Sequence, residues 1–429
     1  MRLPESANVL LLGSGGREHA FAWKIAQSKR LARLFIAPGN AGTALCGTNV
    51  DINPTNFGSV KQFVLSNNIN MVVVGPEEPL VRGIYDFFRE DSQISNIPVI
   101  GPSALGARLE GSKEFAKDFM TRHGIPTARY RSFTKKNVEE AYAFLETLQA
   151  PYVLKADGLA AGKGVLIVPS LEEAKRELGE MLSGRFGHAG DTVVIEEYLS
   201  GIECSVFVAT DGKSYRVLPV AKDYKRVGEG DTGPNTGGMG AYSPLPFVTG
   251  EDERYALERI MQPVADAMCA EGCPFTGVLY GGLMKTRDGI KVIEFNARFG
   301  DPETEVVLPR LKSDIVEIFS AVADGWELEH PLEWHDFSTV GVVLASKGYP
   351  GSYAKGAVIE GLDEVDGAVY HMGTASKEGR IVTAGGRVAI VVCAAPTLGE
   401  ALEKCNREVG KVRCGNLYHR TDIGRKAIK

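Results

Sequence analysis

Short apolar runs alternate with longer mixed stretches over the first hundred residues. The runs cover residues 9–12, 34–37, 71–74 and 99–100, and stretches such as residues 19–28 between them have the length of a helix. Strands that alternate with helices in this way are typical of a parallel sheet with helices on its faces. We therefore expect an N-terminal α/β domain built on a doubly wound parallel sheet.

Loop signals follow three of these predicted strands. They are Gly13-Ser14-Gly15-Gly16, Pro38-Gly39-Asn40 and Gly75-Pro76-Glu77. Ligands of open α/β sheets bind in the crevice at the carboxyl ends of the strands. We expect the substrate crevice at these three loops.

The pattern changes after residue 111. A helix is predicted over residues 112–123, and Gly124-Ile125-Pro126 ends it. A helical pattern at residues 138–148 and short strands at residues 152–155 and 165–168 then indicate a compact α+β module.

The rest of the chain is richer in predicted strands. Strands begin at residues 193–195 and continue to an apolar helix at 315–322, and after Trp334 short strands with Gly turns precede a helix at 398–412. We predict an α/β and α+β multidomain protein, with these parts: an N-terminal domain (1–108), a central domain (109–126 and 192–331), a mobile small lid (127–191) and a β-rich C-terminal domain (332–429).

Composition narrows the class of protein. Hydrophobic residues make up 44% and charged residues 24%, and no apolar run reaches the ~20 residues that span a bilayer. The net charge of −6 does not favour nucleic acid, whose binding needs Lys and Arg against phosphates. The seven cysteines show no paired metal-ligand spacing. We expect a cytoplasmic protein with no nucleic-acid or membrane partner.

A glycine-rich segment joins two predicted strands between Lys155 and Val165. Its small residues allow backbone N–H groups to approach phosphates, and Lys155 and Lys163 supply positive charge. The segment is not a Walker A loop, because Gly164 stands where that loop has Ser or Thr and a strand follows instead of a helix. Taken alone, it fits an ordinary glycine-rich hairpin equally well.

An acidic turn follows the predicted strand at residues 193–195. Residues 196–199 link it to the next strand, which carries Glu203. Such a linker can offer backbone groups to an adenine, and a carboxylate can accept hydrogen bonds from ribose hydroxyls. By itself, a solvated acidic turn is the commoner interpretation.

Polar residues alternate along a predicted strand over residues 292–298. The alternation places Glu294, Asn296 and Arg298 on one face. A carboxylate and an amide oxygen suit Mg²⁺, which prefers oxygen ligands together with substrate phosphates. Arg298 could hold phosphate or carboxylate oxygens with its planar fork. A polar strand face without a ligand is the alternative.

Taken in order, these motifs resemble the ATP-grasp superfamily, and within it the enzymes that join glycine to 5-phosphoribosylamine. The resemblance covers essentially the whole chain. Its motifs are residues 13–20, 75–80, 155–165, 231–242 and 296–305, with 420–424 near the end.

The resemblance implies a role for particular residues. It implies Mg²⁺ or Mn²⁺ at Glu294 and Asn296, and catalytic roles for Arg298, on glycine or its acyl phosphate, and Asp223, on an amine. The residues implied for ATP are Lys113, Lys155, Gly162, Lys163, Gly164, Glu196, Glu197, Leu199 and Glu203. Those implied for phosphoribosylamine are Gly15, Gly16, Arg17, Glu18, Gly75, Glu77, Asn235, Thr236, Gly237, Gly238, Met239 and Asp301.

The implied reaction is a ligation in two steps, carried out by a monomer. ATP would phosphorylate glycine, and the amine of 5-phosphoribosylamine would attack the glycyl phosphate, giving glycinamide ribonucleotide, ADP and phosphate. Catalysis would depend on positioning and on cations, without a covalent enzyme intermediate.

One departure from the superfamily pattern concerns the metal. Many ATP-grasp enzymes carry an acidic ligand on the preceding strand, but residues 280–284 are neutral here. We therefore do not expect a second metal held wholly by protein.

Three alternatives differ in function. A nicotinamide-dependent dehydrogenase is disfavoured because Glu18 stands where its fingerprint has a third Gly. A non-catalytic nucleotide sensor is disfavoured because Lys155, Glu294 and Arg298 are all retained. A sibling ligase that uses another ribonucleotide would differ only in loops 13–20 and 231–242.

Overall fold

The N-terminal part of the chain is organised by a parallel sheet. The structure, a computed structural model, describes residues 3–159, 164–325 and 331–428. The sheet has the strand order β3-β2-β1-β4-β5, which confirms the predicted parallel sheet. Its elements are β1 (Ala7–Gly13), α1 (Gly16–Ile25), β2 (Leu31–Pro38), β3 (Thr48–Asn49), α2 (Phe57–Ser66), β4 (Met71–Val74), α3 (Glu77–Val81), α4 (Ile84–Glu90), β5 (Val99–Ile100) and α5 (Ala104–Gly111).

Strand β1 is buried on both faces. Leu10 and Leu12 enter one apolar core, whereas Val9 and Leu11 enter another, because successive side chains of a strand point to opposite faces. The chain reverses its direction across the sheet between the neighbouring strands β1 and β4. The loops at their carboxyl ends therefore border the crevice that such a switch point leaves open.

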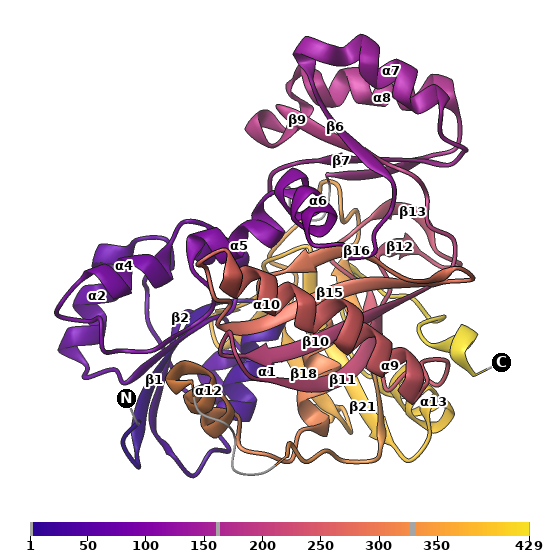
Figure 1. The fold of residues 1–429 in the computed structure, drawn as a ribbon. Coiled ribbons are helices and arrows are strands. Elements are labelled where there is room, and N and C mark those ends of the chain that lie inside the picture. The colour runs from indigo at the N-terminus through magenta and orange to yellow at the C-terminus, as the bar shows by residue number, and fades with distance from the viewer. Residues whose placement is uncertain (1–2, 160–163, 326–330, 429) are drawn as a thin grey trace.

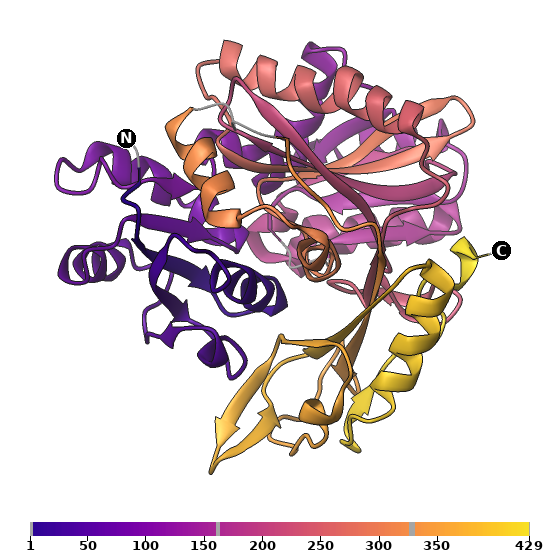
Figure 2. The ribbon, with the colours of Figure 1, turned by 90° about the horizontal axis from the view of Figure 1, so that it is seen from below.

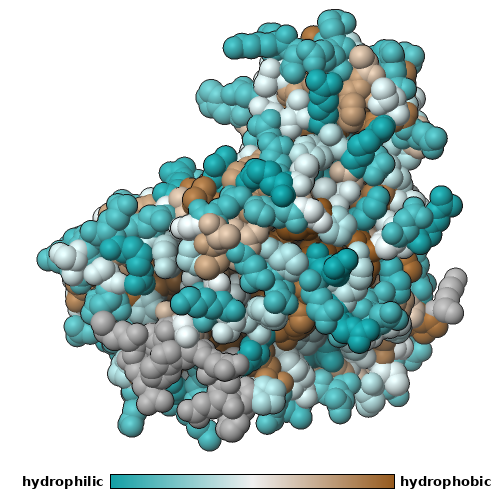
Figure 3. Space-filling model, in the orientation of Figure 1, coloured by the Kyte–Doolittle hydropathy of each residue, from teal (hydrophilic) through white to brown (hydrophobic). Residues whose placement is uncertain are grey.

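A small antiparallel sheet with the order β6-β9-β7-β8 forms the upper lobe of Figures 1 and 3. The sequence prediction placed residues from 192 onward in the central domain, but β9 pairs with both β6 and β7. Val193 and Ile195 complete the core of this module, so its sheet extends to Glu196. Its elements are β6 (Tyr130–Thr134), α7 (Val138–Glu146), β7 (Tyr152–Ala156), β8 (Val165–Val168), α8 (Leu171–Glu180) and β9 (Thr192–Glu196).

One long antiparallel sheet connects the central and C-terminal parts. Its order among the described residues is β16-β15-β10-β11-β14-β17-β21-β18, with β22 beside β17. The C-terminal segment is β-rich as predicted, but β17 pairs with β14, so its strands continue the central sheet. The strands are β10 (Ile202–Thr210), β11 (Tyr215–Asp223), β14 (Gly240–Ser243), β15 (Gly277–Thr286), β16 (Gly289–Asn296), β17 (Ser338–Ser346), β18 (Ala368–His371), β21 (Arg387–Ala395) and β22 (Leu417–Tyr418).

Helices cover this long sheet, and two hairpins extend from it. Figure 2 shows α13 alongside the C-terminal strands, where it contacts β17 and β21. None of the helices within the described residues is long and apolar enough to cross a membrane. The remaining elements are α6 (Lys113–Arg122), β12 (Arg226–Gly228), β13 (Thr232–Asn235), α9 (Gly250–Ala256), α10 (Gln262–Ala270), α11 (Glu303–Val307), α12 (Ile315–Asp324), β19 (Thr374–Lys377), β20 (Arg380–Thr383) and α13 (Leu398–Val409).

The junction between β14 and β17 leaves no room for a side chain at Gly240. A Cβ added there would lie 2.5 Å from the carbonyl oxygen of Gly341, which belongs to the backbone and cannot rotate away. We expect Gly240→Ala to lower the free energy of unfolding by about 1–3 kcal/mol, the usual cost of overpacking. Chemical denaturation followed by circular dichroism measures this change. Gly250→Ala is the control, because an added Cβ meets nothing within 4 Å there. Equal stability of the two variants would contradict the continuous sheet.

Candidate active site

A cavity of about 780 Å³ lies where the three sheets meet. It is bordered by the loops after β1 and β4, by the β7–β8 module and by the end of β16. The structure brings most of the predicted site residues to its wall: Gly15, Arg17, Glu18, Glu77, Lys113, Lys155, Gly164, Glu196, Asp223, Thr236, Gly237, Glu294, Asn296, Arg298 and Asp301.

The other predicted residues either do not themselves line the cavity or fall outside the described residues. Glu203 forms an ion pair with Lys225 (2.6 Å), and the Glu197 carboxylate accepts a hydrogen bond from the Arg129 N–H (3.0 Å). Gly162 and Lys163 fall outside the described residues. The predicted residues that are described but do not line the cavity are Gly16, Gly75, Glu197, Leu199, Glu203, Asn235, Gly238 and Met239.

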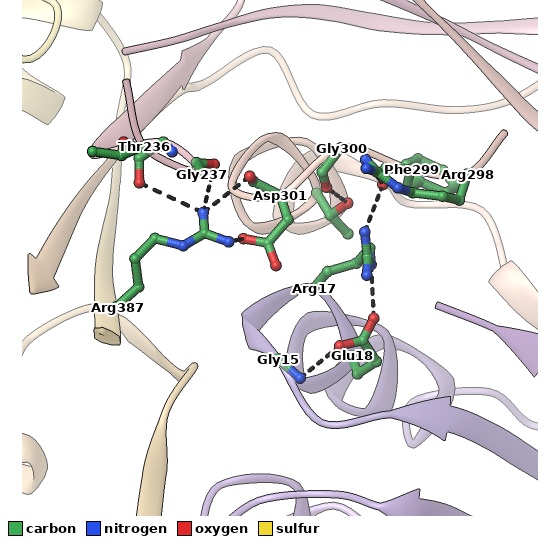
Figure 4. Close-up of polar contacts among 12 residues, drawn as sticks. Gly15, Arg17, Glu18, Thr236, Gly237, Arg298, Phe299, Gly300, Asp301 and Arg387 are labelled. Carbon is green, nitrogen blue, oxygen red and sulfur yellow. Dashed lines mark hydrogen bonds and ion pairs between the residues drawn. The ribbon is translucent and has the colours of Figure 1, made fainter. Parts of the chain in front are cut away.

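Gly75 has a steric reason to be glycine. A Cβ at this position would lie 2.0 Å from Oε1 of Glu18, so the missing side chain makes room for that carboxylate. The Glu18 carboxylate accepts a hydrogen bond from the Gly15 N–H (2.6 Å) and pairs with Arg17 (2.7 Å). Arg17 in turn donates to the carbonyl of Phe299 (3.2 Å), which Figure 4 shows. The first turn of α1 is thereby fixed to the loop that follows β16.

Two lysines share the buried carboxylate of Glu196. Lys117 and Lys155 each lie 2.8 Å from one of its oxygens, and Lys155 also donates to the carbonyl of Ile293 (3.0 Å). Burial opposes ionisation of Glu196, but the two lysines outweigh it and lower its pKa. The sequence assigns backbone groups of residues 196–199 to an adenine, and the structure shows that the Glu196 side chain itself binds lysines within the protein. Lys113 lines the same cavity, so three lysines lie in this part of its wall together with Glu196.

Arg298 is held between two carboxylates from other segments. Its guanidinium lies 2.6 Å from Glu110 on α5 and 3.4 Å from Glu77 on α3, and the Ala297 N–H donates to Glu110 (2.7 Å). Strand β16 ends at Asn296, so Arg298 lies beyond the strand that the alternation predicted. Burial raises the pKa of Glu110 to about 7, although the charge of Arg298 lowers it. Sequence reasoning missed Glu110, because α5 carries no motif.

A second acidic group, Asp223 and Glu303, also lines the cavity. Asp223 at the end of β11 pairs with Lys225 (3.2 Å), and Glu303 accepts a hydrogen bond from the Ser205 hydroxyl (2.9 Å). Burial and then the charge of Asp223 raise the pKa of Glu303 to about 7. Burial likewise raises the pKa of Asp223. From the sequence, Glu303 could be identified only as one of several polar residues after β16.

Glu294 and Asn296 face the cavity from the edge strand β16. Among the residues that the structure describes, no group of three or more His, Cys, Asp or Glu side chains could hold a metal ion. The carboxylate of Glu294 and the amide oxygen of Asn296 offer only part of an oxygen coordination sphere, which phosphates and water would complete. This donor set fits one divalent ion bound together with a nucleotide.

A buried histidine pair joins α1 to β18. The backbone N–H of His371 donates to Nδ1 of His19 (2.8 Å), and Nδ1 of His371 lies 2.9 Å from the Thr374 hydroxyl. Burial, together with the nearby His371, lowers the pKa of His19 to about 3, and burial lowers that of His371 to about 4. Both imidazoles are therefore neutral at physiological pH, and they fix α1, which carries Arg17 and Glu18.

Comparisons with known proteins agree with this architecture. Family models match three successive parts of the chain, described as phosphoribosylglycinamide synthetase N domain (residues 7–110), ATP-grasp (A) domain (111–304) and C domain (339–426). The chain is 49% identical over 428 residues to phosphoribosylamine–glycine ligase of Pseudomonas aeruginosa, with 98% of each protein covered.

Solved structures give the same result. The crystal structure of phosphoribosylamine–glycine ligase from Thermotoga maritima matches with a TM-score of 0.84 and 35% identity, covering 97% of this chain and 100% of that chain. The biotin carboxylase domain of Hydrogenobacter thermophilus 2-oxoglutarate carboxylase, in complex with MgADP, matches with a TM-score of 0.73 and 18% identity, covering 98% and 92%. The second likeness supports the fold alone.

The buried histidines predict a dependence of stability on pH. Between pH ~6.5 and pH ~4 the unfolded chain binds protons at both histidines and the folded chain does not, so stability falls as the pH falls. His19→Asn keeps an acceptor for the His371 N–H but cannot titrate, and we expect a shallower fall of the unfolding midpoint in this range. Thermal unfolding at several pH values measures it. The exposed His188 provides the control variant His188→Asn, and an unchanged slope in His19→Asn would contradict the assignment.

Proposed function

Because the chain belongs to the phosphoribosylglycinamide synthetase family, we propose how its cavity joins glycine to 5-phosphoribosylamine. The chain is an ATP-grasp ligase of purine biosynthesis, and the products are glycinamide ribonucleotide, ADP and phosphate. One observation carries the residue assignment. The same cavity is lined by the lysines, which form its cationic wall, by Glu294 and Asn296 with oxygens that suit a metal ion, by Arg298, and by the acidic group of Asp223 and Glu303.

The cationic wall binds the ATP phosphates in this proposal. Lys113, Lys155 and Gly164 contact the phosphate oxygens, and the assignment also includes Gly162 and Lys163, which fall outside the described residues. Glu196 keeps Lys155 in place by the 2.8 Å ion pair and leaves the cationic wall with excess positive charge. The linker with Glu197 and Leu199 lies beside the adenine, and Glu203 lies beside the ribose.

A divalent metal accompanies the nucleotide in this family. We assign Mg²⁺ or Mn²⁺ to Glu294 and Asn296, because their oxygens suit a hard cation and their strand borders the cationic wall. When bound, such an ion reduces the negative charge of the phosphates that the nucleophile approaches. The two side chains orient the triphosphate toward Arg298.

Glycine lies between Arg298 and the acidic group. The fork of Arg298 binds the carboxylate of glycine, and Asp223 and Glu303 receive its ammonium group. Lys225 is already shared between Glu203 and Asp223. The acidic group of Asp223 and Glu303 therefore retains negative charge that an ammonium can neutralise. A carboxylate oxygen of glycine attacks the γ-phosphorus, ADP leaves, and the glycyl phosphate remains on Arg298.

Phosphoribosylamine enters from the N-terminal sheet. Gly15 to Glu18, Gly75, Glu77 and Asp301 form one side of its site, and residues 235–239 form the other. Its amine attacks the glycyl carbonyl, the new C–N bond forms, phosphate leaves, and the amine nitrogen loses a proton. We propose that a monomer carries out the reaction, because described residues of one chain line the cavity with lysines, an arginine and an acidic group. We also propose that the protein acts in the cytoplasm.

ADP release tests the proposed function directly. The assay combines ATP, Mg²⁺ and glycine with phosphoribosylamine generated in situ, and then omits each component in turn. Dependence on both glycine and phosphoribosylamine supports the assignment. Turnover with another amine acceptor, or without glycine, overturns it.

Glu294→Gln tests the metal assignment. The amide keeps the shape of the side chain but loses the negative charge, so we expect kcat to fall about 100-fold or more, as metal stabilisation is worth several kcal/mol. The thermal midpoint should stay nearly unchanged. Asp288→Asn, at the exposed β15–β16 turn, should retain full activity. A fully active Glu294→Gln enzyme would refute the assignment.

Arg298→Lys tests the arginine fork. Lysine keeps the positive charge, but a single ammonium cannot hold two oxygens in one plane while it pairs with Glu110 and Glu77. We expect kcat to fall sharply in steady-state assays, by about tenfold or more. Arg287→Lys, at a side chain that is 93% exposed, is the matched control. Unchanged kinetics of Arg298→Lys would count against the clamp.

A further inference from the structure

Gly237 is held through both of its backbone groups by the C-terminal segment, residues 332–429. Its N–H donates to the Tyr349 hydroxyl (2.9 Å), and its carbonyl accepts from Arg387 Nη1 (2.7 Å). Arg387 begins β21, and Tyr349 follows β17. Both side chains line the cavity, although neither belongs to a motif.

Arg387 connects the loop of residues 235–239 to Asp301. Its Nη1 donates to the Asp301 carbonyl (3.0 Å), and its Nη2 pairs with the Asp301 carboxylate (2.9 Å), as Figure 4 shows. The Arg387 side chain is half-buried, and the surrounding carboxylates outweigh the effect of that burial and raise its pKa further. A charged fork that is paired in this way is expected to keep one orientation.

The two glycines of the loop fit against Arg387 and Pro302. A Cβ at Gly237 would lie 3.0 Å from Cζ of Arg387, and a Cβ at Gly238, whose φ is +117°, would lie 2.4 Å from Cδ of Pro302. Thr236 closes the turn by donating from its hydroxyl to the Lys225 carbonyl (2.8 Å). The conformation of the loop thus depends on contacts outside itself.

A second arginine of the C-terminal segment holds the other end of the same loop region. Arg420 is fully buried and pairs with Asp231 (3.0 Å) and Asp422 (2.7 Å). It also donates to the carbonyl of Arg226 in β12 (2.8 Å). Residues 231–238 are therefore anchored at both ends by one segment.

We propose that Arg387 is a positioning residue that holds Gly237 and Asp301 together and so shapes the site for the phosphorylated ribose of the amine substrate. Tyr349 assists by accepting the Gly237 N–H. This inference rests on the proposed function of residues 235–239 and Asp301, and it gives the C-terminal segment a part in substrate selection. We assign Arg387 no direct part in ATP binding, because its hydrogen bonds and its ion pair go to the loop of residues 235–239 and to Asp301.

Separate Michaelis constants for the three substrates test this role. In Arg387→Ala we expect the KM for phosphoribosylamine to rise about tenfold or more, because several hydrogen bonds to a charged group are lost. The KM values for ATP and glycine should stay within about twofold. Arg387→Lys should recover only part of the loss, since an ammonium lacks the planar fork. Arg380→Ala, at an exposed arginine of β20, is the control.

Tyr349→Phe keeps the test decisive if Arg387→Ala fails to fold. It removes only the hydroxyl that accepts the Gly237 N–H, so we expect a smaller rise in the same KM and an unchanged KM for ATP. An unchanged KM for phosphoribosylamine in folded Arg387 and Tyr349 variants would overturn the inference, as would an equal rise for all three substrates. A wild-type enzyme that does not consume phosphoribosylamine would instead refute the proposed function.

Discussion

Charges buried inside the cleft must be neutralised by the protein, and this constraint connects the sheets. An ionised group without a partner costs several kcal/mol in a protein interior. Glu196 of the small module therefore lies between Lys117 and Lys155, and Arg298 lies between Glu110 and Glu77 of the N-terminal part. Each set joins segments that are distant in sequence, so the shape of the cleft follows from how its charges are paired.

Incomplete pairing underlies the proposed choice of ligands. Lys113, Lys117 and Lys155 line the cavity beside Glu196, and we assign these lysines to a triphosphate. Asp223 and Glu303 line the same cavity near Lys225, which Glu203 also binds, and we assign them to an ammonium group. In this proposal the lysines and the acidic group orient a substrate that carries both charges, such as an amino acid, with its carboxylate toward the phosphates.

Local patterns were enough to predict the parallel N-terminal sheet and the cavity positions of Lys155, Glu294 and Asn296. They failed where pairing is not local. The apolar run that begins β9 fits either neighbouring sheet, and only its pairing with β6 and β7 decides the matter. Glu110 meets Arg298 across 188 positions, and Arg387 meets Gly237 across 150, so no motif could reveal either contact. Burial also cannot be read from sequence, and it is burial that raises the pKa of Glu110 and Glu303.

The continuity of the long sheet explains why the C-terminal segment can act on the substrate loop. Strand β14 begins at Gly240, directly after the loop, and pairs with β17. Strand β17 in turn pairs with β21, the strand that carries Arg387. The exit of the loop and the arginine that holds it therefore belong to one hydrogen-bonded sheet, and their spacing is fixed. The small module has its own sheet, so its position relative to the body does not alter that spacing. In the proposed function, the C-terminal segment therefore shapes the site of the amine substrate independently of the small module, which carries Lys155 and Glu196.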